Sequence, residues 1–144
     1  MEVNISWRGN LTFIGKSQSG TVLMDASPDV GGEGLAPKPM EMVLFALAGC
    51  TGMDVISILK KMKQKITMLK IDIKAQTRDE HPKVFTKIDL TYNIKGRELD
   101  SEKVKHAVYL SKTKYCSVQA MLSKTAEINY IVNIAKEESE QDDN

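Results

Sequence analysis

The sequence predicts an α+β fold in which antiparallel sheets surround one long central helix. Residues 39–63 form the longest apolar segment of the chain, and apolar side chains fall on nearly every face of the helix they would make. Most other apolar segments alternate apolar and polar residues, which is typical of half-buried strands. These strands follow one another in pairs across short polar turns, as hairpins do. Hairpins combined with a few helices indicate the α+β class.

The first strands are predicted near the N-terminus. Residues 2–8 and 11–16 alternate on either side of a glycine turn and predict a hairpin, and residues 21–25 predict a third strand. Residues 26–39 are rich in proline and glycine, which predicts a loop. Loops of this length carry function more often than shorter connections do.

The central helix is predicted over 39–63. Pro39 suits a first helical turn, where its missing N–H would have no partner anyway, and lysines near the other end complement the helix dipole. A helix apolar on every face is buried or spans a membrane. Glu41 and Asp54 keep the uninterrupted apolar run below the ~18 residues of a span. We therefore expect a buried helix, and a homodimer that covers the surface the small N-terminal sheet leaves open.

Two longer strands are predicted after the helix. Residues 66–77 and 84–95 alternate around a polar turn, which predicts an antiparallel hairpin. A helix over 101–114 follows, and either Asp100 or Ser101 can cap its N-terminus.

The C-terminal part begins where residues 115–117 interrupt that helix. A short second helix is predicted over 118–125 and a last strand over 127–136. Residues 137–144 carry five acidic residues and no basic one, which predicts a solvated, disordered tail. We expect a single domain over 1–136, a length that can bury a core of its own.

The overall charge excludes some classes of partner. The formal net charge of the 144 residues is +1, so we expect neither nucleic acid nor an anionic membrane as a partner. No basic segment followed by an apolar one opens the sequence, so we expect no signal peptide. Two cysteines make no disulfide framework, and a reducing, cytoplasmic location fits them.

Cys50 lies in the middle of the predicted central helix, between Gly49 and Gly52. Each glycine costs a helix ~1 kcal/mol relative to alanine, so the pair would let another backbone approach or leave room beside the sulfur. A free cysteine in a buried helix is more often a small apolar residue than a nucleophile. Asp54 follows one turn later on the same face. It could raise the pKa of the thiol, act as a general acid, bind a cation or face solvent.

Cys116 lies where one predicted helix ends and the next begins. Unpaired N–H groups at a helix N-terminus favour an anion, so we expect a lowered pKa at Cys116 and the more acidic thiol of the two. Lys112 and Lys114 would lower the pKa further if they turned inward.

The segments around both cysteines are similar to those of a known family. Residues 39–42 and Ala48–Gly49–Cys50, preceded by a glycine- and proline-rich loop, resemble the first cysteine motif of the OsmC/Ohr family. The segment YCSVQA at 115–120 resembles the second. The order of the predicted elements agrees over nearly all of 1–136. The chain looks most like the YhfA-type branch of that family.

The resemblance implies an intertwined homodimer with two active sites at the subunit interface. It also implies thiol-dependent reduction of organic hydroperoxides. Cys50 would attack the peroxide and become a sulfenic acid, and Cys116 would then form a disulfide with it. An external dithiol would reduce that disulfide. The resemblance implies no cofactor.

Three positions depart from the pattern of the Ohr branch. The helix-starting proline is followed there by glutamate, whereas Met40 follows it here and the acid comes at Glu41. Glu41 could equally serve as favourable charge in a first helical turn. Arg8 is the nearest match to an activating arginine, although a surface turn suits it as well. Ser117 replaces a frequent proline, and serine is accepted at a helix start.

The sequence thus predicts a peroxidase that reduces organic hydroperoxides through Cys50 and Cys116, with Arg8 and Glu41 as possible supporting residues. The alternative is a small-molecule binding protein of the same fold, with an acyl or thiol ligand and little turnover. His81 and His106 are expected at the surface, and no residue spacing indicates a metal site.

Overall fold

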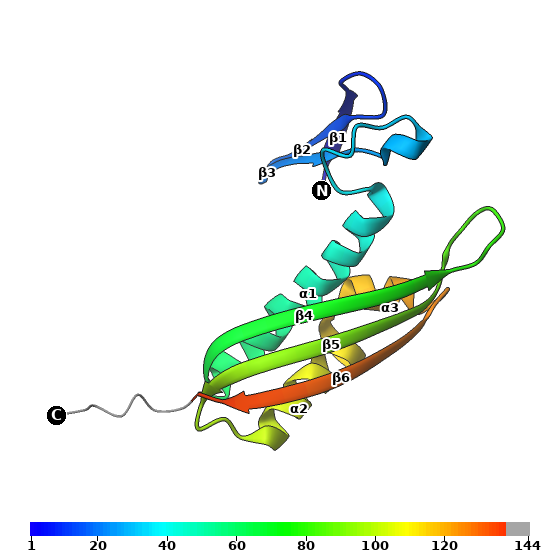
Figure 1. The fold of residues 1–144 in the computed structure, drawn as a ribbon. Helices are drawn as coiled ribbons and strands as arrows, with labels where there is room; N and C mark the ends of the chain where they lie inside the picture. The colour runs from blue at the N-terminus through cyan, green and yellow to red at the C-terminus, as the bar shows by residue number, and fades with distance from the viewer. Residues whose placement is uncertain (138–144) are drawn as a thin grey trace. The chain divides into compact units, whose positions relative to one another are not determined.

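The computed structural model describes residues 1–137, which form two compact units that divide between Phe45 and Ala46 (Figure 1). Helix α1 (Pro39–Lys61) begins in the first unit and continues into the second. Most of the predicted tail, 138–144, lies outside the described residues. That residues 1–136 act as a single domain stays a prediction.

The N-terminal unit contains a three-stranded antiparallel sheet in the order β1 (Val3–Trp7), β2 (Phe13–Ser17) and β3 (Gly20–Met24). The predicted hairpin and third strand are therefore confirmed. A short 3₁₀ turn, η1 (Pro28–Val30), lies within the segment predicted as a loop.

The buried carboxylate of Asp25 organises the loop after β3. It accepts hydrogen bonds from the backbone N–H groups of Ala26 (2.7 Å), Glu33 (3.2 Å) and Leu35 (3.1 Å). These bonds, led by the one from Leu35, lower the pKa of Asp25. A Cβ at Gly32 would lie only 2.0 Å from the Ala26 carbonyl oxygen, so the loop can close this tightly only with glycine there.

The second unit contains a three-stranded sheet in the order β4 (Lys65–Thr77), β5 (Phe85–Arg97) and β6 (Glu127–Lys136). The predicted hairpin of β4 and β5 is confirmed as antiparallel. The prediction of purely antiparallel sheets is wrong for the last strand, because β6 runs parallel to β5.

Helices between β5 and β6 explain the parallel pairing. They are α2 (Ser101–Leu110), the π-helical turn η2 (Ser111–Tyr115) and α3 (Ser117–Leu122). A parallel neighbour requires a crossover connection of this kind, since a tight turn can only reverse the chain. The Asp100 carboxylate caps α2 by accepting from the N–H groups of Glu102 and Lys103.

The core of the second unit lies between its sheet and its helices. Figure 1 shows α2, α3 and the later part of α1 along one face of the sheet. Apolar side chains at alternate positions of β5 and on the helices are buried, and full burial of a Val, Leu or Ile side chain contributes ~1.5–3 kcal/mol. The fully buried apolar residues include Leu47, Val55, Leu59, Ile88, Leu90, Ile94, Val104, Ala107 and Val108.

Helix α1 ends at a lysine-rich turn. Lys63 takes a left-handed backbone conformation (φ 57°), and the Gln64 N–H bonds back to the Leu59 carbonyl at 2.9 Å.

By length and composition α1 could also cross a membrane, a property that core helices of soluble proteins share. Met53 on α1 is 76% exposed in the single chain, so the predicted second subunit would have apolar surface to cover.

Candidate active site

The second unit brings the two cysteines together. The sulfurs of Cys50 and Cys116 and a carboxylate oxygen of Asp54 all lie within 4.8 Å of one another. Both cysteines are free thiols. Cys50 is half-buried, whereas Cys116 is only 3% exposed, so a molecule arriving from solvent reaches Cys50 first.

Local structure explains how each of these side chains is placed. Cys50 and Asp54 are four residues apart on α1, so they share one face of the helix. Cys116 follows the π-helical turn, where its N–H bonds to the Ser111 carbonyl at 2.9 Å. It is also the N-cap of α3, and its sulfur accepts from the Gln119 N–H at 3.4 Å. The predicted break between two helices is therefore confirmed.

The two glycines beside Cys50 have different surroundings. A Cβ at Gly52 would lie 3.4 Å from the Ile71 side chain, so glycine lets α1 approach β4 closely. A Cβ at Gly49 would have no neighbour within 4 Å. Gly49 thus leaves open space at its own position on the surface of α1.

The expectation of a lowered pKa at Cys116 is wrong. The pKa of Cys116 is raised to about 11, mainly by burial and also by the neighbouring Cys50 and Asp54, against the lowering by the Gln119 N–H. One N–H at a six-residue helix does not compensate for loss of water around the sulfur. The lysines do not help, because the ammonium groups of Lys112 and Lys114 lie over the rings of Tyr130 and Tyr115 at 4.6 and 5.2 Å from the ring centroids.

A chain of buried hydroxyl groups leads to Asp54. The Thr51 hydroxyl lies 2.7 Å from the Tyr92 hydroxyl and 2.8 Å from the Ser111 hydroxyl, and Ser111 donates to Oδ2 of Asp54 at 2.9 Å. Thr51, Tyr92 and Ser111 are all buried, and burial raises the pKa of Tyr92 to about 12. Of the possibilities left open for Asp54, a side chain simply facing solvent does not fit this arrangement.

The roles of the three hydroxyl residues were not predicted from the sequence. Their only signals were a threonine directly after Cys50 in an apolar helix and a tyrosine at an inward position of an alternating strand. Neither signal shows that Thr51 will form hydrogen bonds with Tyr92, which is 41 positions away, and with Ser111, which is 60 positions away.

Arg8 and Glu41 belong to the N-terminal unit. Arg8 is exposed at the turn after β1. Glu41 is exposed in the first turn of α1, where its carboxylate accepts from the Lys38 N–H at 2.8 Å. This contact agrees with a helix-start role for Glu41. His81 and His106 are exposed, as predicted.

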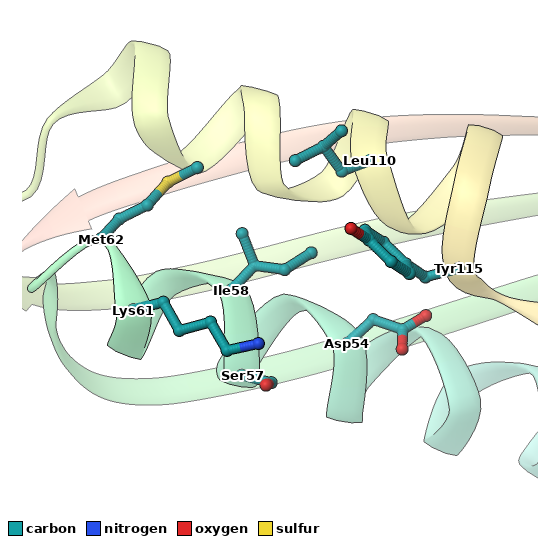
Figure 2. A pocket seen from close by; sticks show the side chains of 7 residues that line it. All are labelled: Asp54, Ser57, Ile58, Lys61, Met62, Leu110 and Tyr115. Atoms are coloured by element: carbon teal, nitrogen blue, oxygen red, sulfur yellow. The ribbon is translucent and has the colours of Figure 1, made fainter.

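An open pocket of about 330 Å³ lies along α1 next to Asp54. Figure 2 shows Asp54 and Tyr115 near one end and Met62 at the other, with Ile58 and Leu110 between them on opposite walls. Lys61 supplies an ammonium group to the otherwise mainly apolar lining. Such a lining suits an alkyl or aryl group of a ligand.

Comparison with known proteins identifies the family. The family model described as "OsmC-like protein" matches residues 31–131. This chain is also 42% identical over 131 residues to Protein YhfA of Escherichia coli K12, covering 90% of this chain and 95% of that protein. The chain therefore belongs to the OsmC-like family.

Solved structures share this fold. A hypothetical protein from Aquifex aeolicus superposes with a TM-score of 0.84 at 32% identity, over 95% of this chain and 97% of that one. An organic hydroperoxide resistance protein OsmC from Legionella pneumophila superposes with a TM-score of 0.66 at 12% identity, over 92% and 97%. The α+β fold predicted from the sequence is the OsmC-like fold, and peroxide-related redox roles are known in this family.

Proposed function

We propose that this protein is a thiol-dependent peroxidase that reduces organic hydroperoxides through Cys50 and Cys116. The observation that carries the proposal is the approach of the two sulfurs to within 4.8 Å, although they are 66 positions apart in the sequence. The description of the Legionella protein as an organic hydroperoxide resistance protein supports the same chemistry.

The different exposure of the two cysteines supports the roles proposed for them. The half-buried Cys50 attacks the hydroperoxide ROOH. Its thiolate takes the terminal oxygen and becomes a sulfenic acid, and the departing alkoxide takes a proton to leave as ROH. The buried Cys116 thiol then condenses with the sulfenic acid, forming the disulfide and releasing water. A dithiol from outside returns both thiols and is itself oxidised to a disulfide.

The pocket next to Asp54 favours an organic substrate. Ile58, Met62 and Leu110 present apolar surface to a bound group, and the flexible methionine adapts to different shapes. Hydrogen peroxide has no group that could use this surface. We therefore expect the protein to discriminate in favour of alkyl and aryl hydroperoxides.

Three further parts of the proposal stay predictions. One is that the working form is a cytoplasmic homodimer, as the exposed apolar surface suggests. The others are that Arg8 and Glu41 support the Cys50 thiolate. Alanine at Arg8 would lower the rate of peroxide reduction if Arg8 acts there and would leave it unchanged if Arg8 only serves the turn.

Intact mass spectrometry tests the proposal directly. The reduced protein receives one equivalent of cumene hydroperoxide and is then alkylated. We expect the loss of two hydrogens, with both cysteines protected from alkylation until a dithiol is added. Cys116→Ser should stop at a sulfenic acid on Cys50, and Cys50→Ser should not react. An equal amount of hydrogen peroxide should react more slowly.

Two unmodified thiols after cumene hydroperoxide would overturn the proposal. That result would favour the alternative of a binding protein, for which a ligand that copurifies should be found by mass spectrometry under native conditions.

A further inference from the structure

The three side chains of the candidate active site are also metal ligands by type. Two cysteine sulfurs and one carboxylate oxygen are ligands that zinc accepts. In a tetrahedral zinc site with bonds of ~2.3 Å to sulfur and ~2.0–2.2 Å to oxygen, neighbouring ligand atoms lie roughly 3.5–3.8 Å apart. The atoms of Cys50, Asp54 and Cys116 already lie within 4.8 Å of one another, so small side-chain rotations would complete the set.

The backbone holds these ligands on ordered elements. Cys50 and Asp54 are one turn apart on α1, the spacing by which one helix supplies two ligands to one ion. Cys116 comes from the capping position of α3, which faces α1 at this point. All three residues belong to the second unit, so the site needs nothing from the N-terminal unit.

A second layer of hydrogen bonds orients two of the three ligands. Ser111 donates to Oδ2 of Asp54 and is itself 2.8 Å from the Thr51 hydroxyl. Oδ1 of Asp54 remains for an ion. The Gln119 N–H donates to the Cys116 sulfur. Metal ligands are characteristically held by outer partners of this kind.

No cationic side chain neutralises Asp54 within residues 1–137. All five ion pairs found in this part of the chain join other residues. The two lysines of η2 are directed to tyrosine rings, as described above. The Lys61 ammonium lines the same pocket but forms no ion pair with Asp54. A half-buried carboxylate beside two thiols, with no ion-pair partner among residues 1–137, is electrostatically suited to a bound cation.

We propose that the reduced protein binds one thiophilic divalent cation, Zn²⁺ in the first place, through Cys50, Cys116 and Asp54. Binding replaces the two thiol protons: Zn²⁺ and two thiols give the zinc dithiolate and two H⁺, with no change of oxidation state. Three protein ligands leave the fourth position to water. The same sulfurs cannot at once hold zinc and form a disulfide. Zinc therefore blocks the peroxide reaction, and this consequence alone rests on the proposed function.

Zinc affinity of the reduced full-length protein tests the binding step. Metal-free protein is titrated with Zn²⁺ in competition with a chromophoric chelator, and native mass spectrometry counts the ions bound. We expect one Zn²⁺ per chain. Cys50→Ser and Cys116→Ser should each abolish it, and Asp54→Asn should weaken it at least tenfold. Co²⁺ should show thiolate charge-transfer absorption in the wild type, which both serine variants lose.

Matched controls separate ligation from loss of folding. Asp72→Asn removes an exposed carboxylate of β4, paired with Lys70 at 2.9 Å, and should leave zinc affinity unchanged. Ser111→Ala should weaken binding about 10- to 100-fold by releasing Asp54. Each variant is first shown to unfold cooperatively. Equal zinc affinity in Asp54→Asn and the wild type, or retention of the ion by Cys50→Ser, would overturn the proposal.

The two proposals fail in different ways. Zinc binding with these dependences, together with thiols that ignore cumene hydroperoxide, would refute the peroxidase and keep the metal site. Disulfide formation without stoichiometric zinc binding would refute the metal site and keep the peroxidase. If both hold, one equivalent of Zn²⁺ should protect the thiols from hydroperoxide until a chelator is added.

Discussion

The hydroxyl group of Ser111 donates a 2.9 Å hydrogen bond to Oδ2 of Asp54, and this bond joins two segments that carry one cysteine each. Ser111 begins the π-helical turn that directly precedes Cys116, and Asp54 lies one turn after Cys50 on α1. The separation of the two sulfurs therefore depends on a contact in which neither cysteine takes part.

Ser111→Ala should destabilise the second unit by about 1–3 kcal/mol, because Thr51 and Asp54 each lose a buried hydrogen-bond partner. Urea unfolding under reducing conditions measures this difference. The exposed Ser123, whose hydroxyl donates to the nearby Ala120 carbonyl, provides the control, and Ser123→Ala should change stability by less than about 0.5 kcal/mol. Equal effects of the two substitutions would show that the buried chain of hydroxyls contributes no special stability.

Alkylation should distinguish the two thiols by rate and by pH. A pKa of about 11 leaves roughly one thousandth of Cys116 as thiolate at pH 8, and this fraction rises about tenfold per pH unit up to pH 10. Iodoacetamide should thus modify the more exposed Cys50 first. The reaction of iodoacetamide with Cys116 should accelerate about tenfold per pH unit up to pH 10.

Peptide mapping at short reaction times reads the two sites separately. Denatured protein is the control, and in it both cysteines should react at similar rates. Faster labelling of Cys116 in the folded protein would contradict the burial that the structure shows.

Much of the fold is predictable from local patterns. Pro39 and the terminal lysines mark the ends of α1, rough alternation marks β4, and regular alternation marks β5. The direction of β6 could not be predicted in this way, because alternation is the same in a parallel and an antiparallel neighbour. The two helices before it were the available signal, since a helical crossover permits parallel pairing.

The site is less predictable than the fold. Spacing alone does not bring Cys50 to Cys116, and only the resemblance of both motifs to one family paired them. Their environment depends on tertiary burial, which reversed the expected acidity of Cys116. The contacts of Thr51 with Tyr92 and Ser111 join three elements, so no local pattern could indicate them.

The stability of the N-terminal unit should fall in acid because of Asp25. Its folded pKa lies below the ordinary value of 3.8, since three backbone N–H groups bond to the charged form. The carboxylate therefore contributes its full stability above the unfolded pKa, and this contribution is lost as the pH falls through the folded pKa. Asp25→Asn should be less stable at pH 7 and should lose this part of the acid dependence.

Trp7 reports on this unit alone, because it is the only tryptophan in the chain and lies at the end of β1. Its fluorescence during thermal unfolding at pH 7 and pH 3 measures the effect, and Glu2→Gln, at an exposed acid of the same unit, is the control. Identical acid dependence in Asp25→Asn and the wild type would mean that the carboxylate does not hold the loop in solution.

The exposed apolar surface predicts a dimer that charge can disrupt. Ile5 on β1 is 57% exposed between two further apolar neighbours on the same face of the strand, and Met53 on α1 is 76% exposed. Burying such surface contributes about 25 cal/mol per Å², so a lysine at either position should oppose association strongly.

Light scattering after size-exclusion chromatography should give twice the chain mass for the wild type and a single chain mass for Ile5→Lys and Met53→Lys. Ile131 on β6 is comparably exposed at 63%, and Ile131→Lys should remain a dimer because the predicted interface involves α1 and the N-terminal sheet. A wild type that elutes as a monomer would leave α1 without its predicted cover and would refute the homodimer.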